Sequence, residues 1–137
     1  MPKLSLKDIV IQEHTPLGAV VIYELKGDKS EIKIGRASSN DIAIPEKGYR
    51  DKDIGIDKVA LTMSREHCTI KYDGSNFTIY DKVGDKESTL GTYVNGEKVP
   101  EKGVVLKNKD KLKFGDYELE VMISEAESND IAVLEEE

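Results

Sequence analysis

The chain has 137 residues, a formal net charge of −7 at pH 7, and charged residues at 34% of its positions. A length of about 100 to 150 residues is typical of one domain around one hydrophobic core. Since a non-specific nucleic-acid binder needs a basic surface to release counterions from phosphates, the acidic balance argues against DNA or RNA as a partner.

The N-terminal region, residues 1–18, is interpreted as an extension before the main domain. Within it Leu4, Leu6, Ile9 and Ile11 recur in a pattern that fits either an extra edge strand or a short amphipathic turn. Thr15 precedes Pro16 and is a candidate for phosphorylation on the basis of that pair alone.

The main domain is expected over residues 19–124 and is predicted to be all-β. Short runs rich in Val, Ile, Tyr and Phe alternate apolar with polar residues and are separated by Gly, Asn, Asp and Ser, which is typical of a sandwich. The expected strands are 19–25, 31–35, 41–44, 67–72, 77–81, 92–94, 104–106, 110–114 and 117–123. Asn95-Gly96 predicts a tight hairpin turn, because a type I′ turn needs positive φ at both central residues.

One segment interrupts this rhythm. Residues 45–63 form a long connection of mixed charge, with a short helical turn expected around 58–62. Connections longer than about 12 to 15 residues are usually functional or disordered. This one should flank any site built at the neighbouring strand ends.

Cys68 is the only cysteine, and it stands in an alternating run, so a reduced and buried thiol is expected. No run of about 18 to 20 apolar residues exists, and no signal-peptide core follows Met1. These observations predict a soluble, cytoplasmic protein without a membrane partner.

The C-terminal segment, residues 125–137, is an acidic tail. It holds six of the 27 acidic residues and no basic one, which leaves 21 acids against 20 bases in the rest of the chain. The tail is either a flexible solubilising end or an internal ligand that folds onto a basic pocket of the same chain.

A series of short motifs runs through the main domain. In chain order they are Gly35-Arg36, Asn40-Asp41-Ile42, Ser64-Arg65-Glu66-His67, Thr89-Leu90-Gly91-Thr92, Asn95-Gly96 and Asp110 to Gly115. Each is common alone, but together, at predicted strand ends and loops, they resemble the forkhead-associated (FHA) family over residues 20–123. The resemblance implies a SMAD/FHA-like β-sandwich of about eleven strands whose loops at one end bind phosphothreonine in an extended peptide.

The resemblance also implies which residues bind the ligand. Phosphothreonine carries a charge of about −1.5 to −2 and three acceptor oxygens, which a guanidinium engages with charge-assisted hydrogen bonds. Arg36 matches that arginine, although a solvated strand-end arginine is the plain alternative. Ser64 matches a serine whose hydroxyl and backbone donate to the phosphate, and Thr89 matches a further phosphate contact. Arg65 would reach the peptide beside it, with a preference for an acidic ligand residue.

Other motif residues have structural interpretations. His67 is expected to brace the Ser64 loop as a neutral imidazole with one donor and one acceptor. Gly35, Gly91 and Gly96 are expected to serve backbone geometry and Asn95 a turn.

Leu90 departs from the family pattern. Most members place asparagine there, where its amide holds the peptide main chain. Losing that hydrogen bond would weaken binding by roughly 0.5 to 1.5 kcal/mol or change how the ligand binds.

Three functions follow for comparison. The first is an adaptor that recognises phosphothreonine in partner proteins of Ser/Thr kinase signalling. The second is a degenerate FHA scaffold that binds unphosphorylated protein partners or self-associates. The third is an enzyme, and the sequence supports it least, because it shows no nucleophile with a base, no phosphate-binding glycine loop and no metal-ligand spacing. His14 and His67 are too few for a zinc site. No cofactor is expected.

Overall fold

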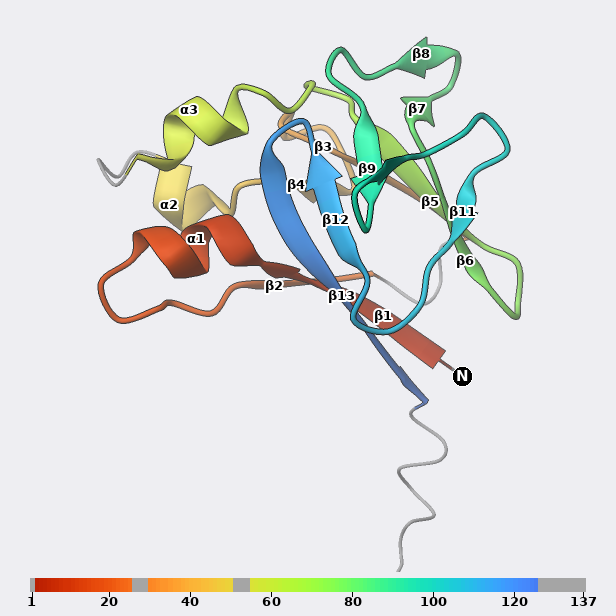
Figure 1. The fold of residues 1–137 in the computed structure, drawn as a ribbon, viewed down its shortest axis with the longest axis horizontal. Coiled ribbons are helices and arrows are strands. Elements are labelled where there is room, and N and C mark those ends of the chain that lie inside the picture. The colour runs from red at the N-terminus through yellow and green to blue at the C-terminus, as the bar shows by residue number, and fades with distance from the viewer. Residues whose placement is uncertain (1, 26–29, 51–54, 126–137) are drawn as a thin grey trace, which may run out of the picture.

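The structure is a computed structural model that describes residues 2–25, 30–50 and 55–125. In these residues β-strands dominate, and three short helices accompany them (Figure 1). The strands are β1 (Pro2–Asp8), β2 (Ile22–Glu24), β3 (Glu31–Gly35), β4 (Ile42–Ala43), β5 (Cys68–Tyr72), β6 (Phe77–Tyr80), β7 (Lys82–Val83), β8 (Lys86–Glu87), β9 (Thr92–Val94), β10 (Glu97–Lys98), β11 (Val104–Val105), β12 (Lys111–Phe114) and β13 (Tyr117–Glu125). The helices are α1 (Ile9–His14), α2 (Lys47–Arg50) and α3 (Ile56–Ala60).

Two sheets form the sandwich. The larger has six strands in the order β10-β9-β12-β13-β1-β2, and the smaller has five in the order β11-β6-β5-β3-β4, while β7 and β8 pair separately. The prediction of an all-β sandwich is confirmed, and all nine expected strands are present with boundaries shifted by a few residues. The short strands β7 and β8 were missed because two-residue strands leave too little alternation to detect.

The N-terminal strand lies inside the larger sheet. All seven residues of β1 pair antiparallel with β13, from Pro2 opposite Glu125 to Asp8 opposite Leu119, and its other edge pairs with β2. The edge-strand alternative is therefore wrong. The second alternative, a short amphipathic turn, describes the next residues, because α1 follows at once with Val10 and Ile11 buried.

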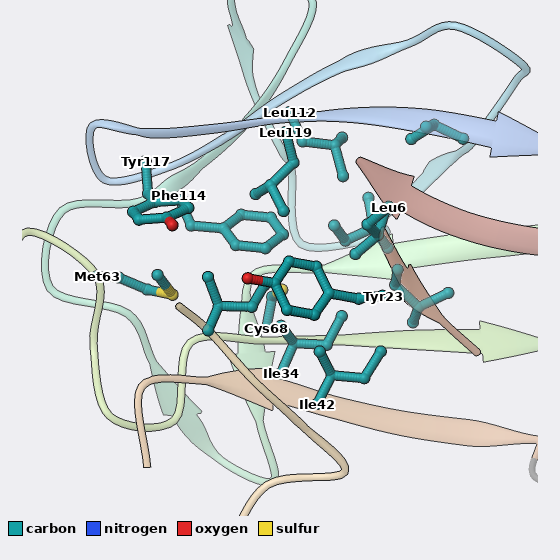
Figure 2. Close-up of a cluster of buried hydrophobic side chains, with 14 of the residues drawn as sticks. Leu6, Tyr23, Ile34, Ile42, Met63, Cys68, Leu112, Phe114, Tyr117 and Leu119 are labelled. Atoms are coloured by element: carbon teal, nitrogen blue, oxygen red, sulfur yellow. The ribbon is translucent and has the colours of Figure 1, made fainter. Parts of the chain in front are cut away.

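The core lies between the two sheets. Figure 2 shows side chains from both, and the labelled ones are Leu6, Tyr23, Ile34, Ile42, Met63, Cys68, Leu112, Phe114, Tyr117 and Leu119. Cys68 is a free, fully buried cysteine, as expected. Burial raises the pKa of its thiol well above the usual value, so the group remains a neutral, apolar part of the core.

A buried carboxylate connects the first strand to the rest of the domain. Asp8 accepts hydrogen bonds from the hydroxyls of Tyr23 and Tyr117, each at 2.6 Å, and from the backbone N–H of Ile11 at 2.8 Å. It therefore caps the N-terminus of α1 and joins three segments distant in sequence. Burial raises the pKa of Asp8, because the charged form loses its hydration.

The long connection between β4 and β5 contains the two other helices. Ile56, Ala60 and Met63 are buried, so this segment contributes to the core as well as covering one end of the sandwich. The short helical turn expected around 58–62 is present as α3, which begins at Ile56. Within the described residues no helix is long and apolar enough to cross a bilayer.

The Thr15 hydroxyl forms hydrogen bonds at the C-terminal end of α1. Its hydroxyl donates to the carbonyl of Ile11 at 2.9 Å and accepts from the N–H of Ala19 at 2.7 Å. A phosphate on Thr15 would remove the bond to Ile11, because the phosphorylated oxygen has no hydrogen to donate. The hydroxyl therefore has a structural use that the Thr-Pro pair did not reveal.

The Asp8 cluster gives a stability prediction. Asp8→Ala should lower the free energy of unfolding by about 2 to 4 kcal/mol, because it removes a helix cap and leaves two buried hydroxyls without their acceptor. Asp8→Asn keeps an acceptor for Ile11 and should lose clearly less. Urea unfolding measures both, and equal losses would contradict this account.

The same cluster predicts a pH effect. Because the folded-state pKa of Asp8 is raised, its contribution to stability is fully present below the usual value of 3.8 and is lost as pH rises through the folded pKa. Relative to Asp8→Asn, whose amide does not titrate, the wild type should be most stable at the acid end of that window. Unfolding free energies of the two proteins at several pH values provide the test, and a constant difference would count against it.

Candidate functional site

Ser64 stands in the loop between α3 and β5. Its Oγ accepts a hydrogen bond from the backbone N–H of Thr89 at 2.9 Å, which brings the two loops together. This bond uses a lone pair of the hydroxyl, so its hydrogen can still be donated to an anion. The backbone N–H of Ser64 instead donates to Nδ1 of His67 at 3.0 Å. The expectation that both the hydroxyl and the backbone of Ser64 face the ligand is therefore corrected, because the amide is used within its own loop.

His67 is buried between the same two loops. Nδ1 accepts from Ser64, so Nε2 carries the proton and donates to the carbonyl of Gly91 at 2.9 Å. The ring also packs on Phe114, with 5.3 Å between centroids. Burial lowers the pKa of His67, which keeps the imidazole neutral and able to form both bonds.

Arg36 follows Gly35 at the end of β3. The chain passes so close to the Ser64 loop here that a Cβ on Gly35 would lie 2.2 Å from the carbonyl oxygen of Arg65. Only glycine permits this approach. Arg36 N–H donates to the Ser64 carbonyl at 3.2 Å, and Arg36 Nε donates to the Met63 carbonyl at 2.5 Å. The guanidinium is therefore held beside Ser64.

Two polar residues outside the expected set fix these loops. The Asn40 amide donates to the carbonyls of Ala37 at 2.9 Å and Arg65 at 2.7 Å. Asp81 accepts from the hydroxyls of Ser88 and Thr92, each at 2.6 Å. Asn40 and Thr92 stand within the motifs quoted above, but their bonding partners depend on loop positions that the sequence does not show.

The candidate site is a cavity of about 610 Å³ at this end of the sandwich. Its lining residues are Ala37, Ser39, Ser64, Arg65, Glu66, Lys86, Glu87 and Thr89. The lining holds two bases and two acids, so it is close to neutral. Arg36 is not among these lining residues, but its side chain lies next to the Ser64 loop, because its Nε donates to the carbonyl of Met63.

The expected residues divide into two groups. The structure brings together Gly35, Arg36, Ser64, Arg65, His67, Thr89 and Gly91. Asn95 and Gly96 lie apart, in the two-residue turn between β9 and β10, where φ is 51° and 88°. The predicted hairpin with positive φ at both residues is confirmed, and the Asn95 amide is bonded to Asp110 and Lys111.

The acidic tail begins far from this cavity. The turn before β13 contacts the site, since Gly115 N–H donates to the Gly91 carbonyl at 2.9 Å, whereas β13 ends at Glu125 opposite Pro2. A nine-residue strand spans roughly 30 Å. Residues 126–137, and with them the proposed contact between tail and pocket, lie outside the described residues.

The chemistry of the site is that of anion binding. In the described parts of the chain no three His, Cys, Asp or Glu residues are grouped to hold a metal ion. What these bonds bring together is the Arg36 side chain, the Ser64 hydroxyl and the backbone of Thr89. Such an arrangement can neutralise and orient a phosphate.

Comparison with known families identifies the class of protein. The FHA domain profile matches residues 32–115, which is more than half of the chain. The chain therefore belongs to the FHA family, as its motifs predicted. No curated protein matches it in sequence.

Solved structures share the fold. One comes from a structural and functional analysis of phosphothreonine-dependent FHA domain interactions. It is 21% identical to this chain with a TM-score of 0.61, and the match covers 90% of this chain and 98% of the other. Mycobacterium tuberculosis EmbR, in complex with a low-affinity phosphopeptide, is 24% identical with a TM-score of 0.60, over 89% of this chain and 24% of the other. The yeast Dun1 FHA domain, in complex with a doubly phosphorylated peptide derived from Rad53, is 22% identical with a TM-score of 0.60, over 98% and 84%.

The buried His67 predicts acid sensitivity. Since its folded-state pKa is lowered, its contribution to stability is present above the usual value of 6.5 and is lost as pH falls from there through the folded pKa. Wild type should therefore lose more stability on acidification through this window than His67→Gln, which cannot titrate. Urea unfolding at each pH measures this, and identical pH profiles would show that His67 is not responsible.

Proposed function

We propose that this FHA domain binds phosphothreonine in partner proteins of Ser/Thr kinase signalling, as an adaptor without catalytic activity of its own. The observation that carries the proposal is the convergence of Arg36, Ser64 and Thr89. Ser64 Oγ is bonded to the Thr89 backbone, and Arg36 Nε is bonded to the carbonyl just before Ser64. Three loops thus bring the Arg36 side chain, the Ser64 hydroxyl and the Thr89 backbone next to one another.

Each residue has a distinct role in the proposal. The Arg36 guanidinium engages the phosphate with charge-assisted hydrogen bonds, while the hydroxyls of Ser64 and Thr89 donate to its oxygens. Arg65 is exposed at the mouth of the cavity and contacts the peptide beside the phosphate. The structures of EmbR and Dun1 with phosphopeptides support this use of the fold.

Rigid placement supports the proposal further. His67 and Asn40 donate to backbone carbonyls and Asp81 accepts from Ser88, and these bonds fix the loops before any ligand arrives. A site whose donors are already oriented loses less conformational entropy on binding. The proposal therefore predicts that binding depends on few side chains and leaves the loops largely in place.

Arg36 provides the main test. Arg36→Ala should weaken binding of phosphothreonine peptides by about 3 kcal/mol or more, on the order of 100-fold, because the charge-assisted bonds are lost. Calorimetry with peptides selected from a degenerate phosphothreonine library, and with their unphosphorylated forms, measures this. Lys3→Ala is the matched control, since Lys3 is an exposed cation on β1 opposite Ser124, at the far end of the sandwich.

Two results would sink the proposal. One is a wild-type protein that binds both peptide forms equally. The other is an Arg36→Ala protein that keeps its thermal stability and its affinity for the phosphorylated form. An Arg36→Ala protein that unfolds would show that the bond to Met63 is structural, and Arg36→Lys then tests the guanidinium separately.

The alternative function rests on Leu90. This side chain is half-exposed at the site, where most FHA domains place an asparagine, and it can neither donate nor accept a hydrogen bond. A scaffold that binds unphosphorylated partners or itself through an apolar contact would use such a residue. Equal binding of both peptide forms, or a concentration-dependent dimer in sedimentation, would favour this alternative.

A further inference from the structure

A second cavity lies between the edges of the two sheets. It has a volume of about 530 Å³, and its walls include β10, the edge strand of the larger sheet, and β11, the edge strand of the smaller one. Asn95, in the turn after β9, also lines it, whereas the candidate phosphate site lies beside Gly91, before β9 begins. This cavity, called the edge cavity below, is therefore at the other end of β9 from the phosphate site.

Both edge strands direct backbone groups away from their own sheets at this cavity. Leu106 N–H donates across to β6 at 2.8 Å, and Val99 N–H donates across to β9 at 2.9 Å. Because hydrogen-bonded and non-hydrogen-bonded residues alternate in an antiparallel ladder, the N–H and C=O of Val105 and of Lys98 point outward. Both residues line the edge cavity. Sheet edges of this kind readily pair with a further extended segment.

The lining combines aliphatic and charged side chains. Val104 and Val105 form β11, and Val105 is 44% exposed. The charged lining residues are Lys98, Lys102, Lys107, Glu97 and Asp110. Three bases and two acids give the lining a net charge of +1, and none of these lysines is in a salt bridge with another described residue. The edge cavity therefore suits a segment that carries both apolar and acidic side chains.

The cavity beside the other two edge strands has the opposite charge. It lies along β2 and β4, and its described lining holds three acids, Glu24, Asp41 and Glu46, against one base, Lys47. An acidic segment would be repelled there. Charge thus distinguishes the two cavities at the sheet edges.

The acidic tail starts beside the edge cavity. Ile123 N–H donates to Asn108 Oδ1 at 2.9 Å, and Asn108 is the neighbour in sequence of Lys107 in the lining. β13 ends two residues after Ile123, and residues 126–137 follow it. Residues 128–130 are Ser-Asn-Asp, which favour a turn, and residues 131–137 are Ile-Ala-Val-Leu-Glu-Glu-Glu. A reversal at 128–130 would return this apolar and acidic run to the level of Lys107.

We propose that residues 131–137 dock in the edge cavity of the same chain as a strand added along β11, with the apolar run over Val105 and the glutamates beside the lysines. The tether favours this contact, because a short linker gives a millimolar effective concentration, so even an affinity of about 1 mM occupies roughly half of the molecules. Docking covers an exposed sheet edge and so limits pairing with other chains. The inference is independent of phosphothreonine binding.

A spin label on the tail tests the proposal in the full chain. The only native cysteine, Cys68, is fully buried, so Glu137→Cys provides one accessible thiol for a nitroxide. The label should reduce the amide signal intensities of Val104 and Val105 by about half or more, in line with the occupancy given above. The signals of Ser64 and Thr89, at the candidate phosphate site, should keep their intensity.

Charge variants separate docking from mere proximity of the tail. The double variant Lys102→Glu and Lys107→Glu, in the Glu137→Cys background, should restore most of the lost intensity at Val104 and Val105, because like charges then oppose docking. Lys33→Glu with Lys58→Glu is the matched control. These exposed lysines lie on β3 and α3 and give the same change in net charge, so the intensity loss should persist.

Three results would overturn the inference. The first is a set of Val104 and Val105 signals that the label leaves unchanged or reduces equally in both double variants. The second is a loss at Ser64 and Thr89 in their place, which would put the tail at the phosphate site. The third is a loss of Val104 and Val105 intensity in an unlabelled, isotope-enriched chain mixed with the spin-labelled one, which would show that the tail docks on a second copy.

Discussion

The geometry of the site depends on the buried neutral imidazole of His67. One ring nitrogen accepts from the Ser64 amide and the other donates to the Gly91 carbonyl. These two bonds join loops that are 24 residues apart in sequence. A neutral histidine supplies one donor and one acceptor on opposite sides of a rigid ring, and burial keeps it in that form. The bond from the Thr89 N–H to Ser64 Oγ joins the same two loops a second time.

In the rest of the site, too, polar groups hold the loops and other residues are left to meet a ligand. Residues that would meet a ligand, such as Ser64, Arg65 and Thr89, are exposed or half-buried, while the polar groups that place them are bonded inside the loops. The Asn40 amide donates to two backbone carbonyls, and Asp81 accepts from two hydroxyls. These bonds lie within the protein and hold the loops that carry the exposed residues. This is how preorganised anion sites achieve affinity with few contacts.

The core behind the site is enlarged by segments at both sides of it. β1 fills the gap between β13 and β2, and the buried Asp8 cluster ties it to Tyr23 and Tyr117. Met63 is buried at the end of the long connection, and its carbonyl receives the Arg36 side chain. The long connection, residues 45–63, is thus hydrogen-bonded to the arginine that is proposed to bind phosphate. In Figure 1 the loops of the site lie at one end of the sandwich, and the N-terminus and the end of β13 lie at the other.

The sequence by itself determined the fold class, nine of the strands, the Asn95-Gly96 turn and the family. Alternation of apolar residues and turn chemistry are local properties, so they can be read without the fold. The sequence also singled out Arg36, Ser64, His67 and Thr89, but only because their motifs follow a familiar order. The interior position of β1 depended on the tertiary structure, since alternation shows which face of a strand is buried and not which strands lie beside it. The same holds for the use of the Ser64 amide by His67 and for the roles of Asn40 and Asp81. Each of these depends on which loops meet at the end of the sandwich, and that is fixed by long-range packing.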